Sequence, residues 1–173
     1  MRYAVCYVAL AAWTGFAVLP SNADEVAFRR HAINTESEFG SCAAIDVNRD
    51  GRLDIVSGGF WYAAPDWSKQ TAREVELIRG RYDDYSNLPL DVDGDGLTDL
   101  VSVNYRSRSL YWVAQPRAPS GVWQKHVIDT PGPSETGRLA DVNSDGRLDV
   151  LPNDTDIEAG YDMLPADSNR RKS

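Results

Sequence analysis

Three segments of the chain share one nine-residue pattern, D-V-[ND]-x-D-G-x-x-D, and they read Asp46-Val47-Asn48-Arg49-Asp50-Gly51-Arg52-Leu53-Asp54, Asp91-Val92-Asp93-Gly94-Asp95-Gly96-Leu97-Thr98-Asp99 and Asp141-Val142-Asn143-Ser144-Asp145-Gly146-Arg147-Leu148-Asp149. Side-chain oxygens at positions 1, 3, 5 and 9 of such a loop, with the main-chain carbonyl at position 7, can converge on one hard cation. Glycine at position 6 lets the chain turn with a positive φ at little cost. Position 7 alternates between arginine and leucine, as expected if only its carbonyl is used. The pattern predicts three loops that each bind a structural Ca²⁺.

The predicted ligands are the four side chains and the one carbonyl in each loop. They are Asp46, Asn48, Asp50, Asp54 and the carbonyl of Arg52; Asp91, Asp93, Asp95, Asp99 and the carbonyl of Leu97; and Asp141, Asn143, Asp145, Asp149 and the carbonyl of Arg147. The loops hold ten of the 26 acidic residues, and without these ten the chain has 16 acidic residues against 18 basic ones. The formal charge of −8 therefore comes from the loops. A single such segment could be an ordinary polar turn, but three in register argue against that interpretation.

The residues around the loops predict strands and exclude an EF-hand. An EF-hand needs a glutamate at position 12 and flanking helices, whereas position 12 here is Ser57, Ser102 or Pro152. Short β-branched segments follow the loops, for example Leu97–Val103 after the second loop. We therefore expect each loop to connect two adjacent antiparallel strands, with the valine at position 2 anchoring the loop to the apolar layer.

A longer repeat surrounds the loops. Their first residues are 45 and 50 positions apart, the spacing of four short strands per propeller blade. Phe28–Ile33 and Trp123–Ile128 contain a histidine fifteen residues before a loop, and Arg73–Ile78 has the same offset before the middle loop. Aromatic segments that end in proline, Phe60–Pro65 and Leu110–Pro116, follow the first two loops. The sequence thus predicts an all-β chain of repeated small sheets.

The loops, the L-D-I-V strand after the first of them and the aromatic segments together resemble the FG-GAP or VCBS repeats of bacterial secreted proteins and of the integrin α-subunit propeller. The resemblance covers residues 26–152. It implies β-propeller blades with Ca²⁺ in the hairpin loops and surfaces that bind proteins or glycans. Three loops correspond to about three FG-GAP-type blades, which is an incomplete ring because propellers have four to eight blades.

Three segments of different character divide the chain. Residues 1–23 have a positive start, an apolar run of about 15 residues and small residues before Asp24, which is the layout of a signal peptide and too short to span a membrane. Residues 24–152 form the three-repeat segment, and 153–173 form a polar tail expected to be disordered. We expect a secreted, periplasmic or cell-surface protein without membrane insertion after cleavage. We further expect it to be a truncated member of a longer family or, alternatively, an oligomer that closes the ring.

The acidic balance and the absence of a basic stripe exclude nucleic acid as a partner. No catalytic motif is present. We expect structural roles for His31 and His126, a solvated turn at Asp83-Asp84, a buried Cys42, and packing between blades for most aromatic residues. The expected function is non-catalytic binding of an extracellular protein or glycan. The alternatives are a lectin and a fragment of a calcium-dependent, glycan-active enzyme such as a lyase.

Overall fold

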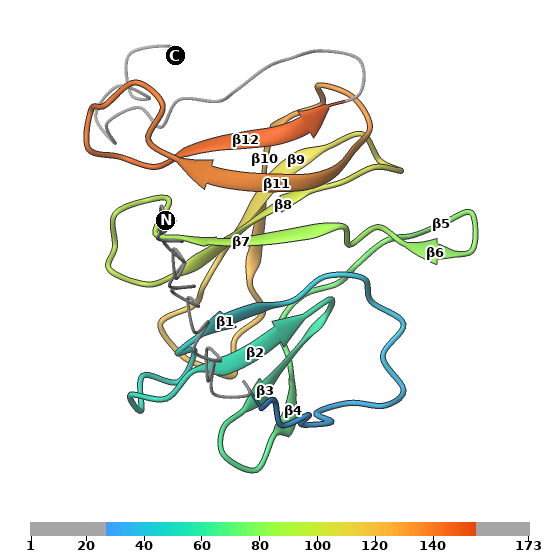
Figure 1. Cartoon of the computed structure of the whole chain (residues 1–173), viewed down its shortest axis with the longest axis vertical. Helices are drawn as coiled ribbons and strands as arrows, with labels where there is room; N and C mark the ends of the chain where they lie inside the picture. Colours follow the sequence, from blue (N-terminus) through green and yellow to red (C-terminus); the bar gives the residue numbers. More distant parts are fainter. Residues whose placement is uncertain (1–26, 155–173) are drawn as a thin grey trace, which may run out of the picture. The chain divides into compact units, whose positions relative to one another are not determined.

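The computed structural model describes residues 27–154 of the chain (Figure 1). The chain divides into two units, Met1–His31 and Ala32–Ser173, and every described strand belongs to the second unit. The predicted signal peptide at residues 1–23 lies outside the described residues. Of the predicted tail at 153–173, only residues 153 and 154 are described, and both belong to the last strand.

The described residues form an all-β fold, as the sequence predicts, and contain no helix. The described part of the chain therefore contains no helix that is long and apolar enough to cross a membrane. The strands are β1 (Ala43–Ile45), β2 (Asp54–Ser57), β3 (Phe60–Ala63), β4 (Ser68–Thr71), β5 (Leu77–Ile78), β6 (Arg81–Tyr82), β7 (Ser86–Leu90), β8 (Asp99–Val103), β9 (Leu110–Ala114), β10 (Gln124–Asp129), β11 (Ser134–Ala140) and β12 (Asp149–Asp154).

The strands form three antiparallel sheets and a small ribbon. The first sheet is the meander β1-β2-β3-β4, the second sheet is the meander β7-β8-β9-β10, and the third sheet contains β11 and β12 among the described residues. The ribbon β5–β6 lies between the first two sheets along the chain. The first strands of the sheets lie side by side, since β7 contacts both β1 and β11 (Figure 1). Four-stranded antiparallel meanders are the units from which propeller blades are built.

Each predicted loop connects the first two strands of a sheet. We call residues 46–54 the first loop, 91–99 the middle loop and 141–149 the third loop. In all three hairpins the residue before the loop pairs with the aspartate at position 9: Ile45 with Asp54, Leu90 with Asp99, and Ala140 with Asp149. This identical register confirms the prediction that the loops join adjacent strands.

The core lies between the sheets. All five residues of β8 are buried, although a strand with one solvated face would alternate. Leu100 of β8 belongs to one cluster with Val56 and Trp61 of the first sheet, while Val101 and Val103 belong to another with Val150 of β12. The second sheet is thus covered on both faces by its neighbours, and burial of each large aliphatic side chain contributes roughly 1.5–3 kcal/mol.

The expected strands before the loops form only in part. Trp123–Ile128 largely coincides with β10, but Phe28–Ile33 forms no strand and Arg73–Ile78 contributes only Leu77–Ile78 to β5. The strand β10 is the outer strand of the sheet that precedes the third loop. No described sheet precedes the first loop, so Phe28–Ile33 has no such sheet to join. After β4, the carbonyl of Gly59 accepts N–H groups from both Ala72 and Arg73, and the strand ladder ends there.

Two further expectations are wrong. Cys42 is exposed, because the alternation of β1 turns Ala43 and Ile45 inward and leaves the preceding position outside. Asp83 and Asp84 do not lie in a solvated turn, since they are 3% and 2% exposed. The Asp83 carboxylate accepts the backbone N–H groups of Arg106 and Ser107, and Asp84 pairs with Arg73, so both charges are compensated inside the fold.

Candidate metal centre

The backbone of the three loops is held by their own acidic side chains. The carboxylate at position 1 accepts the N–H of the glycine at position 6, the oxygen at position 3 accepts the N–H of position 5, and the carboxylate at position 5 accepts the N–H of position 7. The distances are 2.9, 3.0 and 2.9 Å in the first loop, 3.0, 3.1 and 2.9 Å in the middle loop, and 2.9, 2.9 and 2.9 Å in the third loop. Each carboxylate oxygen retains a further lone pair for another partner. The loops therefore present their oxygens in one repeated arrangement.

Positive φ angles occur at two positions in every loop. Position 6 is glycine with φ of 84°, 83° and 86°, as the pattern predicts. Position 4 also has a positive φ, at Arg49 (61°), Gly94 (75°) and Ser144 (63°), and the sequence pattern does not reveal this requirement because the residue there varies. Only the middle loop has a glycine at position 4, so only there is this conformation free of the penalty that a Cβ brings.

The aspartate at position 9 is the buried part of the site. Asp54, Asp99 and Asp149 are at most 1% exposed, and each accepts the N–H of the valine at position 2, at 2.9–3.0 Å. Asp54 also accepts the N–H of Ala64, and Asp99 that of Gln115, both at 2.8 Å. In these two loops the aspartate therefore connects the loop to the residue that follows the third strand of its own sheet, β3 or β9. This structural role could not be predicted from the sequence.

The middle loop brings three carboxylates together. One oxygen each from Asp91, Asp93 and Asp99 lies within 4.8 Å of the others. Asp95 lies outside this triad, and its carboxylate pairs with Arg117 at 3.2 Å. In the first and third loops, position 3 is an asparagine, Asn48 or Asn143. The aspartate at position 5 of these loops pairs with the arginine at position 7, Asp50 with Arg52 at 3.6 Å and Asp145 with Arg147 at 3.7 Å. The ligand sets predicted for these two loops, and the carbonyl ligands of all three, stay predictions.

Electrostatics at the triad favour a cation. The pKa of Asp99 is raised to about 6, chiefly by burial; the charges of Asp93 and Asp91 add to the rise, and the N–H groups of Gln115 and Val92 oppose it. A bound cation would stabilise the ionised carboxylate that burial disfavours. The donors are all hard oxygens, which suit Ca²⁺, Mg²⁺ or Mn²⁺ rather than the softer metals. The residues present therefore fit a hard divalent cation.

Gln115 couples the first two loops. Its backbone N–H binds Asp99, and its side-chain Nε2 donates to the carbonyl of Val47 at 2.8 Å. Val47 is 1% exposed, as expected for the anchoring valine, whereas the equivalent Val142 is 62% exposed. The third loop lacks this cover because no further described sheet packs beyond β11 and β12.

His126 and several of the aromatic residues singled out by the sequence have packing contacts, whereas His31 is exposed and its structural role stays a prediction. His126 of β10 stacks on Trp112, with ring centroids 4.4 Å apart and planes 17° apart. Trp61, Tyr62, Tyr111 and Trp123 are 3–4% exposed, which confirms their expected packing between strands and sheets.

A comparison with known protein families matches part of the chain. Residues 91–151 match the family described as FG-GAP-like repeat. The matched segment starts at position 1 of the middle loop and ends two residues after the third loop, so it includes both loops and strands β8 to β11. No curated protein matches the chain. The repeat implies that the four-stranded sheets are propeller blades.

Proposed function

We propose, starting from the FG-GAP-like repeat at residues 91–151, that the chain is an exported, calcium-stabilised propeller-blade module that binds an extracellular protein or glycan and has no catalysis of its own. The observation that carries this proposal is the triad of Asp91, Asp93 and Asp99, whose oxygens lie within 4.8 Å of one another in the middle loop. Such a group of carboxylates repels itself in a partly buried place unless a cation is bound.

Calcium has a structural part in this function. When bound, it neutralises the carboxylates at the end of the hairpin. Asp91 and Asp93 hold the loop backbone, and Asp99 ties the loop to the segment after β9. Because Gln115 also contacts the first loop, an ordered middle loop supports the neighbouring sheet. Up to three Ca²⁺ ions stabilise the blades.

The test is a calcium titration of the whole chain by isothermal titration calorimetry, with thermal unfolding followed by circular dichroism in Ca²⁺ and in EDTA. Extracellular calcium sites have dissociation constants of roughly 0.1–1 mM, so we expect binding in this range. At a Ca²⁺ concentration a hundredfold above the dissociation constant, the native state gains about 2.7 kcal/mol and the melting temperature rises. A chain with no heat of binding and the same melting temperature in both buffers contradicts the proposal.

The described residues form two four-stranded sheets and the two-stranded sheet of β11 and β12, fewer than the four to eight blades of a propeller. We therefore include in the proposal that copies of the chain associate to complete the propeller. Light scattering coupled to size-exclusion chromatography tests this part. A monomer across the micromolar range in Ca²⁺ contradicts the association and leaves the calcium site unaffected.

A further inference from the structure

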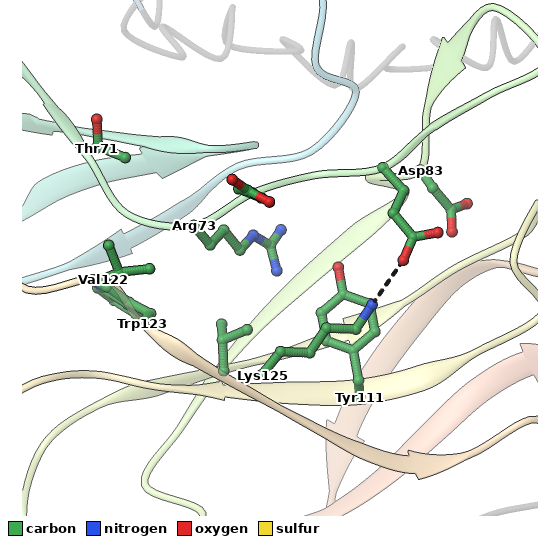
Figure 2. A pocket seen from close by; sticks show the side chains of 10 residues that line it. Thr71, Arg73, Asp83, Tyr111, Val122, Trp123 and Lys125 are labelled. Carbon is green, nitrogen blue, oxygen red and sulfur yellow. Dashed lines mark hydrogen bonds and ion pairs between the residues drawn. The ribbon is translucent and has the colours of Figure 1, made fainter.

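Two pockets away from the calcium loops differ in charge. The pocket between the first and second sheets has a volume of about 380 Å³ and is lined by three acidic and two basic residues (Figure 2). Both of its cations are already paired, Lys125 with Glu76 at 3.3 Å and Arg73 with the buried Asp84 at 2.8 Å. This pocket therefore offers no free positive charge to a ligand.

The second pocket is basic. It has a volume of about 270 Å³ and is lined by Ile78, Arg79, Tyr105, Arg106, Arg108 and Pro133; we call it the arginine pocket. These residues come from the β5–β6 ribbon, the turn between β8 and β9 and the connection from β10 to β11. No acidic residue of the described part of the chain lines it, although the whole chain has a formal charge of −8. The pocket is thus a local reversal of the sign of the charge.

Arg79 supplies the free charge of the arginine pocket. The residue is exposed and forms no hydrogen bond or ion pair with the described residues. Arg106 is half-buried, and its Nε donates to the hydroxyl of Tyr85 at 3.1 Å, which leaves the N–H groups of its two Nη atoms for another acceptor. Arg108 already has another interaction within the fold and contributes its charge. An anion in the pocket can therefore accept hydrogen bonds from two different guanidinium groups.

The turn that carries Arg79 does not itself favour arginine. Arg79 and Gly80 join the paired residues Ile78 and Arg81, and both turn residues have a positive φ, 50° and 74°. Two-residue hairpin turns of this kind prefer Asn-Gly or Asp-Gly, because other side chains raise the free energy of the left-handed conformation. Arg108 also has a positive φ, 59°, in the turn between β8 and β9. Two arginines of one pocket thus occupy strained backbone positions, a feature that clusters at ligand sites.

Buried hydrogen bonds hold the β8–β9 turn against the ribbon. Asp83, the first residue after β6, accepts the backbone N–H groups of Arg106 and Ser107 at 3.0 and 3.1 Å. Asn104 closes the turn from within, since its backbone N–H and its Nδ2 both donate to the carbonyl of Ser109, at 3.1 and 3.3 Å. The backbone beneath the arginines is therefore ordered before a ligand binds, which lowers the entropic cost of binding.

We propose that the arginine pocket binds a sugar that carries a sulfate or phosphate ester. The ester oxygens accept hydrogen bonds from Arg79 and Arg106, and the C–H face of the sugar ring lies on the ring of Tyr105, which is 40% exposed. A tetrahedral ester has acceptor oxygens in several directions, which suits guanidinium groups that come from two turns. A single ester suits the pocket better than a polyanion, because the rest of the chain is acidic. This inference rests on the proposed binding function, for which it names the ligand class and the site.

The test measures binding of the 6-sulfates and 6-phosphates of galactose and glucose to the whole chain in saturating Ca²⁺, by calorimetry and saturation-transfer NMR. The controls are the two unsubstituted sugars and inorganic sulfate. We expect at least one ester to bind tenfold or more tightly than its parent sugar, since a hydrogen bond to a charged group contributes about a factor of ten or more. The comparison of the sulfates with the phosphates identifies the ester. If no ester binds more tightly than its parent sugar, or if inorganic sulfate binds as tightly as the best ester, the proposal is overturned.

Arg79→Asn tests the charge of the pocket. The substitution removes the guanidinium and gives the turn a residue that its backbone favours, so the variant should fold and should bind the ester about tenfold more weakly. Its control is Arg81→Gln, which removes the same charge from the adjacent strand β6, where Arg81 does not line the arginine pocket. Equal losses in the two variants would assign the binding to the overall charge of the hairpin and overturn the site.

Tyr105→Leu tests the placement of the sugar ring. The loss of the aromatic face should weaken binding of the ester about threefold and leave the affinity for inorganic sulfate unchanged. Its control is Tyr105→Phe, which keeps the ring and should bind the ester as the unaltered chain does. An ester affinity that is the same in Tyr105→Leu and Tyr105→Phe would overturn the contact between the sugar and Tyr105.

Calcium binding by the same samples separates this inference from the proposed function. Weaker ester binding by Arg79→Asn and Tyr105→Leu, with both controls and the calcium affinity unchanged, supports the site. If the unaltered chain binds Ca²⁺ and an unsubstituted glycan or an acidic peptide but no ester, the inference fails while the proposed function stands. If it binds Ca²⁺ but no glycan or protein at all, both fail.

Discussion

The middle loop and the first loop have the same backbone hydrogen bonds but a different arrangement of charge. In the middle loop, Asp91, Asp93 and Asp99 form a carboxylate triad, and position 7 is a buried leucine. In the first loop, position 3 is Asn48, and the arginine at position 7 lies 3.6 Å from Asp50. The third loop follows the first in both respects.

This difference shows which features belong to the fold and which to the cation. The aspartate at position 9 and the glycine at position 6 have equivalent hydrogen bonds in both loops, so they form the hairpin whether or not the charge density is high. The additional carboxylate at position 3 and the missing arginine at position 7 concentrate negative charge in the middle loop. We therefore expect equal structural costs but unequal calcium affinities when equivalent positions are changed.

The largest expected effect is at position 9. Asp99→Ala leaves the N–H groups of Val92 and Gln115 without their acceptor, and Asp54→Ala does the same to those of Val47 and Ala64. Each unpaired buried donor costs about 1–3 kcal/mol, so both variants should lose about 2–6 kcal/mol. Urea unfolding in calcium-free buffer measures the loss. If Asp99→Ala alone were destabilising, position 9 would serve the cation and not the hairpin.

The next effect concerns pH and the buried carboxyl of Asp99. Its pKa of about 6 in the folded chain lies above the usual 3.8, so the folded state binds the proton more tightly than the unfolded state. This contribution to stability is fully present below about pH 4 and is lost as the pH rises through about 6, by roughly 3 kcal/mol in calcium-free protein. Titration of the Asp99 carboxyl by NMR checks the pKa. Asp93→Asn should lower it, because one neighbouring charge is removed; an unchanged value would show that the charge of Asp93 does not contribute to the shift.

An exchange of position 3 between the loops has a smaller effect and bears directly on the comparison. Asp93→Asn gives the middle loop the side chain of the first, and Asn48→Asp gives the first loop that of the middle. We expect the calcium affinity of the altered loop to fall or rise roughly tenfold, or about 1.4 kcal/mol. Calorimetry on the two single variants and the double variant measures this. If the calcium affinity of a loop does not change with the carboxylate at position 3, another feature determines which loop binds calcium more tightly.

Much of this architecture could be predicted from the sequence because the loop pattern recurs. The hairpins at the three loops and the buried aromatic residues followed from the spacing of Asp, Gly and aromatic residues. Long-range partners could not be predicted: Asp83 and Asp84 are buried because Arg73 and two backbone N–H groups of a distant turn lie against them. The pairing of Asp95 with Arg117 depends in the same way on a segment that is 22 residues away.

The smallest effect is expected at position 4, where the loops differ in backbone strain. Gly94 has a φ of 75° and no atom within 4 Å of the place that a Cβ would take, so Gly94→Ala should cost about 1 kcal/mol through the backbone alone. Arg49 has the same conformation with a side chain, and Arg49→Gly removes the penalty of its Cβ. The substitution also increases the freedom of the unfolded chain and removes the exposed hydrogen bond from the Arg49 guanidinium to the carbonyl of Arg117, so we expect a net change within about 0.5 kcal/mol. Urea unfolding of both variants, with Gly80→Ala in the β5–β6 turn as a second glycine at positive φ, gives the comparison. If Gly94→Ala cost no more than Arg49→Gly, the glycine at position 4 would have no conformational role, and the middle loop would differ from the first by its charge alone.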